Sequence, residues 1–117
     1  MSEDIRLKTM PFEYDGKTYT LRCNMNVLAD VQEMNGGDIS PALSGGRAMK
    51  NSLMFLAAMM NDWADEQGWP ERYTWRGLGR VLRTENVPMV GIITLVLDAL
   101  TPAQEANAGE SETDPGN

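Results

Sequence analysis

Few side chains in this chain of 117 residues are of the types that support catalysis. It contains no histidine and a single cysteine, Cys23. A thiol nucleophile needs a nearby base or cation to form its thiolate, and imidazole is the usual one. Serine, threonine, aspartate and lysine are present, but they form neither a G-x-S-x-G elbow nor a glycine-rich phosphate loop. We therefore expect a non-catalytic protein that needs no cofactor.

Three carboxylates, Asp62, Asp65 and Glu66, share one side of a predicted helix because they stand at positions i, i+3 and i+4. Carboxylate oxygens can collect a hard cation, but a calcium site also uses loop carbonyls and a glycine turn. This segment has neither. A solvated acidic face is the favoured interpretation, and no metal site is predicted.

A basic stripe repeats at helical spacing in the stretch that follows. It consists of Arg72, Arg76, Arg80 and Arg83. Nucleic-acid binding through it is disfavoured, because the net charge is −7 and this face offers no base-reading group. An acidic surface of the same monomer or of a second copy is a better target, and a solvent-exposed salt-bridge face is the alternative. The predicted self-association residues are Asp62, Asp65, Glu66, Arg76, Arg80 and Arg83.

The element expected at the N-terminus is a β-hairpin at about residues 5–23. Asp15 and Gly16 suit a type I′ turn, in which both central residues need a positive φ. The register that follows from this turn pairs Tyr14 with Lys17, Phe12 with Tyr19 and Met10 with Leu21. It gathers apolar side chains on one face, which helices must cover because a lone hairpin is only marginally stable.

Apolar spacing and capping residues predict four helices, at about residues 25–35, 47–67, 74–83 and 87–100. Asn24 or Asn26 can cap the first helix, and Asn86 the fourth. The residues expected to face inward from the fourth helix are Val90, Ile93, Val96, Leu97 and Leu100. The predicted fold class is α+β and mainly α, with an N-terminal β-hairpin packed on a bundle of about four helices.

The length of the chain suits a single globular domain, expected at residues 1–101. Residues 102–117 carry four carboxylates, no base and no large apolar side chain, so a disordered acidic tail is predicted there. A lone cysteine allows no intrachain disulfide, and neither a leader sequence nor a membrane span is recognisable. We expect a cytoplasmic protein.

Two of the predicted helices carry more apolar side chains than one buried face can use. Several of the extra side chains are methionines, whose flexible thioethers adapt to varied partners. The surplus indicates either a contact surface for another protein or burial on several sides. The predicted protein-binding residues are Met54, Phe55, Met59, Ile92 and Leu95.

The order of these parts is similar to that of a known family. An F-E-Y-D-G-K-x-Y-x-L hairpin at residues 12–21 is followed by a short helix that ends in E-M-N-G-G at residues 33–37. A long apolar helix and shorter helices follow, and then a polar tail. Over about residues 5–101, the chain resembles the small tail assembly chaperones of long-tailed bacteriophages and prophages.

This resemblance implies a non-catalytic factor in the cytoplasm of the host bacterium. Such a factor binds the helical tape measure protein, keeps it soluble, helps to recruit tail tube protein and is absent from the mature virion. No site residue is carried over, because the family has no fixed ligand motif. A virion structural protein, such as a head–tail connector or tail-completion component, is the main alternative, and a helical nucleic-acid-binding regulator is another.

Overall fold

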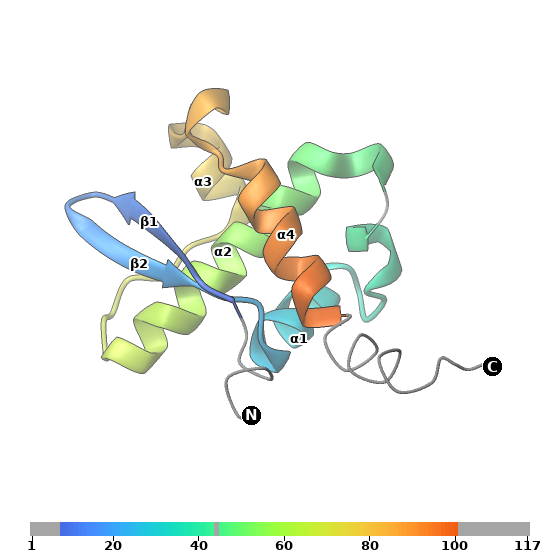
Figure 1. Cartoon of the computed structure of the whole chain (residues 1–117), viewed down its shortest axis with the longest axis horizontal. Coiled ribbons are helices and arrows are strands. Elements are labelled where there is room, and N and C mark those ends of the chain that lie inside the picture. The colour runs from blue at the N-terminus through green and yellow to red at the C-terminus, as the bar shows by residue number, and fades with distance from the viewer. Residues whose placement is uncertain (1–7, 44, 101–117) are drawn as a thin grey trace.

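The structure is a computed structural model that describes residues 8–43 and 45–100 (Figure 1). Its elements are β1 (Met10–Tyr14), β2 (Lys17–Leu21), α1 (Met25–Met34), α2 (Ala48–Gln67), α3 (Trp75–Val81) and α4 (Met89–Leu100), with short 3-10 turns η2 (Ser40–Leu43), η3 (Gly45–Arg47) and η4 (Thr84–Asn86). The predicted fold class, α+β and mainly α, is confirmed. The predicted tail at residues 102–117 lies outside the described residues.

The hairpin forms with the predicted turn and register. Asp15 and Gly16 have φ values of 54° and 78°, as a type I′ turn requires. All three predicted pairs are present between the antiparallel strands. Tyr19 and Leu21 are buried, whereas Thr18 is exposed on the opposite face. The apolar face is therefore the covered one.

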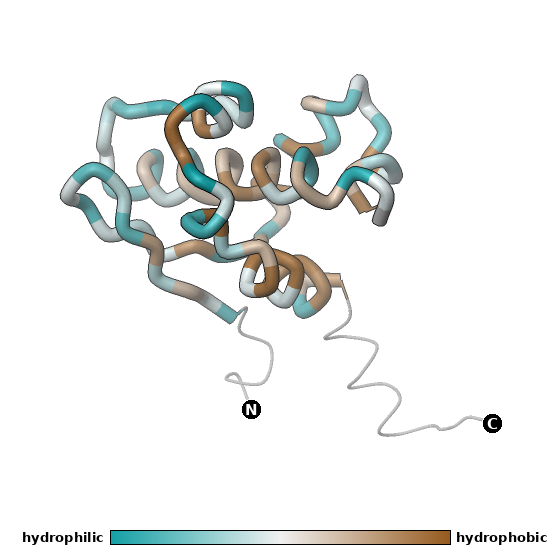
Figure 2. Tube along the Cα trace, turned by 90° about the horizontal axis from the view of Figure 1, so that it is seen from above, coloured by the Kyte–Doolittle hydropathy of each residue, from teal (hydrophilic) through white to brown (hydrophobic). Residues whose placement is uncertain are grey.

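Helix α2 is the centre of the core, and its residues 51–60 are all buried. It contacts β2, α1, α3 and α4, which surround it on several sides. Figure 2 shows hydrophobic residues concentrated along α2 and α4. Of the two explanations for the apolar surplus of α2, the structure therefore selects burial on several sides.

The face that helix α4 turns inward shares only Val96 with the predicted one. Ile92, Leu95 and Val96 are buried, whereas Val90 and Ile93 are exposed. Leu97 and Leu100, also predicted to face inward, are exposed as well. Both faces of α4 are apolar, so spacing alone could not choose between them. Gly91 lies on the side of α4 that faces the hairpin, where a Cβ atom would overlap the flexible end of the Met10 side chain.

Two capping predictions have different outcomes. The Asn24 side chain accepts a hydrogen bond from the Val27 amide at 3.0 Å, so Asn24 is the N-cap of α1. Asn86 lies in η4 and does not cap α4, which begins three residues later. The Ile92 amide instead donates to the Pro88 carbonyl, because proline is well suited to a first helical turn.

Aromatic residues that follow α2 pack on the hairpin. The Tyr19 ring meets Tyr73 edge-on at 5.8 Å and Trp69 at 5.3 Å between ring centroids. The two tyrosine hydroxyl groups also form a hydrogen bond. Asn61 of α2 holds the Tyr73 backbone by accepting from its amide at 2.7 Å and donating to its carbonyl at 2.9 Å. The segment between α2 and α3 thereby covers the apolar face of the hairpin.

Candidate functional site

The five predicted protein-binding residues are Met54, Phe55, Met59, Ile92 and Leu95. All are buried, with exposed fractions between 0 and 4 %. The prediction that they form an exposed contact surface is wrong for the folded chain. They lie in the core because the hairpin and the other helices enclose α2, and because α4 turns Ile92 and Leu95 toward it.

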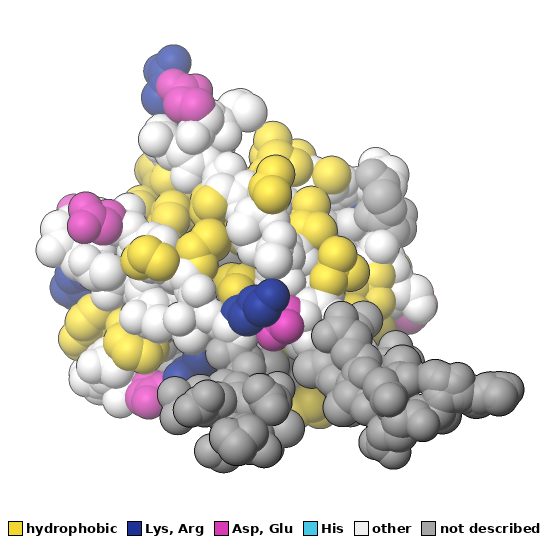
Figure 3. Space-filling model, viewed as in Figure 1, with side chains coloured by type: hydrophobic (Ala, Val, Ile, Leu, Met, Phe, Trp, Pro, Cys, Tyr) yellow, Lys and Arg dark blue, Asp and Glu magenta, His cyan; other side chains and the backbone are white. Residues whose placement is uncertain are grey.

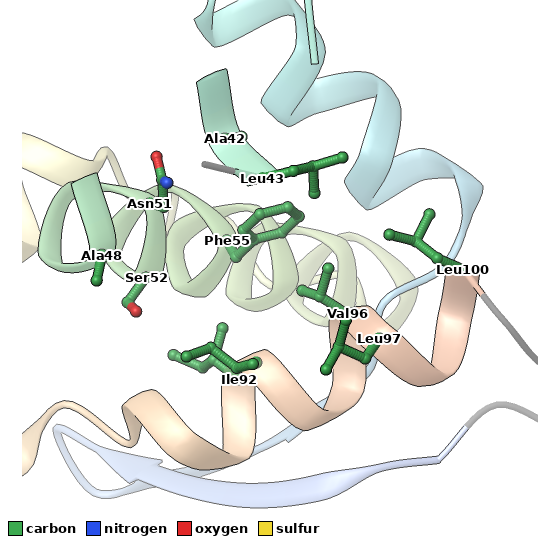
Figure 4. A pocket seen from close by; sticks show the side chains of 11 residues that line it. Ala42, Leu43, Ala48, Asn51, Ser52, Phe55, Ile92, Val96, Leu97 and Leu100 are labelled. Atoms are coloured by element: carbon green, nitrogen blue, oxygen red, sulfur yellow. The ribbon is translucent and has the colours of Figure 1, made fainter. Parts of the chain in front are cut away.

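An apolar groove lies between the N-terminal half of α2, helix α4 and η2 (Figure 4). Two of the predicted residues, Phe55 and Ile92, lie at its floor, and Phe55 sits between Leu43 and Val96. The groove has a volume of about 250 Å³. Its lining residues are Ala42, Leu43, Ala48, Asn51, Ser52, Phe55, Ile92, Ile93, Val96, Leu97 and Leu100.

The rim of this groove leaves large apolar side chains in water. Ile93 is 46 % exposed, Leu97 55 %, and Leu43 and Leu100 are also exposed. Figure 3 shows hydrophobic side chains gathered over α4 on this side of the molecule. A cluster of large exposed apolar side chains around a concave surface is typical of a binding site for another apolar surface. The surplus that the sequence indicated is present, but on different residues of α4.

Among the described residues, no charged side chain lines the groove. Its polar lining side chains belong to Asn51 and Ser52, which are both buried in the wall formed by α2. A charged metabolite would therefore lose its hydration without gaining a counter-charge. Apolar side chains, by contrast, would gain free energy as they leave water. The groove is thus suited to the apolar face of a peptide or helix.

The predicted acidic self-association residues are largely neutralised within the chain. Arg22 reaches Asp62 at 3.1 Å and also pairs with Glu66. Asp65 pairs with Arg72 at 3.2 Å. Arg22 was not among the predicted residues, because it lies 40 and 44 residues from the two carboxylates along the chain. These contacts favour the alternative in which the three carboxylates form salt bridges within their own chain.

The predicted basic residues divide into two groups. Arg83 pairs with Glu85 at 2.8 Å. Arg76 instead lies over the Trp75 ring at 4.7 Å, and Arg80 is exposed beside it. Neither Arg76 nor Arg80 forms an ion pair with another residue in the described ranges. Of the six charged residues predicted to mediate self-association, only Arg76 and Arg80 therefore lack an ion-pair partner within the described ranges.

The single cysteine is placed where it is unreactive. Cys23 is buried, and burial raises the pKa of its thiol to about 11. A thiol with that pKa is only about 0.1 % thiolate at pH 8, against roughly a quarter for a free cysteine. We expect iodoacetamide at pH 8 to label the native chain far more slowly than the chain unfolded in urea, as measured by intact mass. Equal labelling rates in the two states would contradict this placement.

Comparisons of the chain with protein-family models, curated proteins and solved structures give no match. Within residues 8–43 and 45–100, no helix has the length and apolarity needed to cross a membrane. The same ranges contain no cluster of three or more acidic or cysteine side chains placed to hold a metal ion. The apolar groove is the feature from which a function can be argued.

Proposed function

We propose that this chain is a non-catalytic tail assembly chaperone that holds a helical segment of the tape measure protein in the apolar groove. The observation that carries the proposal is the uncharged groove with Ile93 and Leu97 exposed on its rim. The order of the hairpin, the long apolar helix and the shorter helices supports the choice of family. The chain would act in the cytoplasm of the host bacterium, help to recruit tail tube protein, and be absent from the mature virion.

The dimensions of the groove favour a helix as its occupant. One wall is α4, whose 12 residues correspond to a length of roughly 18 Å, or about three helical turns. An amphipathic helix of similar length can place side chains at positions i, i+3, i+4 and i+7 along such a wall. The volume of about 250 Å³ is smaller than the roughly 300–1,000 Å³ of typical small-molecule pockets. The groove can instead accept a few apolar side chains of a larger partner.

The expected affinity is modest, which suits a chaperone that must release its client. If a client helix buried about 400 Å² of apolar surface, the gross gain would be roughly 10 kcal/mol at 25 cal/mol per Å². Lost rotational and translational freedom offsets about 4–15 kcal/mol of such a gain. A single copy is therefore expected to bind and release its client repeatedly, and several copies along one long client would keep it covered.

Substitutions at the rim of the groove test the proposal. We expect co-expression of the chain to raise the soluble yield of the tape measure protein from the same genome. Ile93→Asp and Leu97→Asp should each remove most of this gain, because a carboxylate would be desolvated against the apolar floor. A cost of about 2 kcal/mol would weaken binding roughly 30-fold. The measurement is the soluble fraction of the client after centrifugation.

Val90→Asp is the matched control for these variants. Val90 lies on the same helix and is 79 % exposed, but it does not line the groove. We expect this variant to keep the client as soluble as the original chain does. Circular dichroism should show that all three variants remain folded. Full client solubility with Leu97→Asp, or an equal loss with Val90→Asp, would contradict the proposed site.

The composition of purified phage particles distinguishes the chaperone from a structural protein of the virion. A connector or tail-completion protein would use the same groove for a permanent contact. It would therefore remain in the particle at a fixed copy number. We expect mass spectrometry of the particles to detect the tape measure and tube proteins without this chain. Its presence at a fixed ratio to the tube protein would overturn the chaperone function.

A further inference from the structure

A second surface, separate from the apolar groove, lies between α1, the C-terminal half of α2 and residues 72–80. We call it the α1 crevice. It consists of two depressions, of about 480 and 450 Å³. Asp30 of α1 and Arg72 line the first, and Met34 of α1 and Arg76 line the second. Since Asp30 and Met34 are four residues apart, both depressions open along the same side of α1. No residue of the crevice lines the groove.

One end of the α1 crevice has an excess of negative charge. Asp30 lines this end, and Glu33 lies near it on α1 without lining either depression. Both are exposed and form no ion pair with another described residue. The pKa of Asp30 is raised by partial burial and then by the charges of Glu33 and Asp62. Arg72 also lines this end, but it pairs with Asp65, and Arg22 pairs with Asp62, so Asp30 has no cationic partner among the described residues.

The other end of the α1 crevice is positive and contains an aromatic ring. The Lys50 ammonium and the Arg76 guanidinium lie 4.8 Å and 4.7 Å from the centroid of the Trp75 ring. Arg80 lines the same depression and is also exposed. Among the described residues, none of these three cations has a carboxylate partner. This end is therefore complementary to an acidic surface.

We propose that a second copy of the chain occupies the α1 crevice in a two-fold symmetric dimer. Asp30 and Glu33 of each copy face Arg76 and Arg80 of the other. Both ends lie along one crevice, so a rotation of 180° brings each acidic end onto a basic end. Met34, which is 37 % exposed and lines the depression of Arg76 and Arg80, becomes covered on association. This geometry keeps the predicted roles of Arg76 and Arg80 and replaces the predicted acidic partners with Asp30 and Glu33.

The net charge of −7 on each copy opposes this association at long range. At an ionic strength of about 0.15 M, the Debye length is roughly 8 Å. Charges farther apart than this are largely screened, whereas charges in contact across the crevice are screened much less. The local pairs therefore decide the outcome at this ionic strength. We expect a weak dimer that dissociates as salt is raised further.

A charge-swap experiment on the full chain tests the dimer. One variant carries Arg76→Glu and Arg80→Glu, and the other carries Asp30→Lys and Glu33→Lys. Sedimentation velocity at about 0.15 M salt should find dimers of the original chain, and each variant alone should dimerise at least tenfold more weakly. An equimolar mixture of the two variants should restore the dimer, because every facing pair is then again of opposite charge.

Matched controls separate the α1 crevice from the other surfaces. Arg83→Glu makes the same charge change at an exposed residue that does not line the crevice, and it should leave the dimer intact. Leu97→Asp, at the rim of the groove, should also dimerise normally. Loss of the dimer with Leu97→Asp would move the interface to the groove and overturn the proposal. All four charge-swap positions are exposed, so the variants should fold.

Three further results would overturn the proposal. The first is an original chain that stays monomeric up to about 100 µM, and the second is a mixture of the two variants that fails to dimerise. The third is a mass that grows beyond the dimer with concentration, which would indicate head-to-tail contacts. Neutralising Glu105, Glu110, Glu112 and Asp114 to their amides should leave the dimer intact. A loss of dimer would instead assign the basic end to that acidic segment.

Discussion

Met59→Asp is expected to leave the chain unfolded at 25 °C. The Met59 side chain is fully buried in α2. Removing its apolar atoms costs about 2–5 kcal/mol. The new carboxyl group has no partner in the core, and an unpaired buried polar group adds several kcal/mol even when it stays protonated. A small domain has a free energy of unfolding of about 5–15 kcal/mol. The two costs together approach or exceed this value.

Urea unfolding followed by circular dichroism measures this effect. Met59→Leu nearly conserves the volume and should cost less than about 1.5 kcal/mol. Met49→Asp changes the same residue type on the same helix at an exposed position, and it should have a small effect. A Met59→Asp chain with the unfolding midpoint of the original chain would contradict the burial of this residue. Aspartate substitutions at Met54 or Met59 therefore test folding, whereas those at Ile93 and Leu97 test client binding in the groove.

Arg22→Met is expected to cost about 2–4 kcal/mol, the second-largest effect. Arg22 follows β2, pairs with Asp62 and Glu66 of α2, and lies over the Trp63 ring at 5.7 Å. The Asp62 side chain is only 9 % exposed. Without the guanidinium, a nearly buried carboxylate would face the negative charge of Glu66. Breaking a buried pair from one side costs about 3–5 kcal/mol, and partial exposure of Arg22 reduces this value.

Thermal and urea unfolding of Arg22→Met, Asp62→Asn, the double variant and a control measure the contribution of this pair. In the double variant Arg22→Met and Asp62→Asn, the unpaired charge is absent, so its loss of stability should be smaller than the sum of the two single losses. Arg83→Met is the control, because its ion pair with Glu85 is exposed on both sides and should contribute little to stability. Equal losses for Arg22→Met and Arg83→Met would contradict the role given to Arg22.

Features that depend on neighbouring residues could be predicted from the sequence. Asp15 and Gly16 specify the turn by their positive φ values, and this turn specifies the strand register. The bounds of the four helices agree with the predicted ranges to within two residues. Gly68, with a φ of 77°, ends α2 where the prediction placed its end. Each of these features depends on interactions within a few residues, which the order of residues specifies directly.

The candidate site could be predicted only in part. Phe55 and Ile92 were selected for their surplus apolar surface, and they do line the groove, but at its buried floor. Ile93 and Leu97, which form the rim, were expected to face inward. The Arg22 pair was missed because its partners lie 40 and 44 residues away along the chain. Contacts at this separation depend on where whole elements pack.

The sequence by itself determined the hairpin, the four helices and the presence of more apolar surface than two helices need. Only the tertiary structure decided which part of that apolar surface is covered by neighbouring elements. Periodicity shows that a side of a helix is apolar, but it contains no information on the neighbour that packs there. For α2 this was settled by enclosure on several sides, whereas α4 packs on α2 with Gly91 toward the Met10 side chain of β1. The groove therefore exists because α4 turned one apolar face to the core and left the other at the surface.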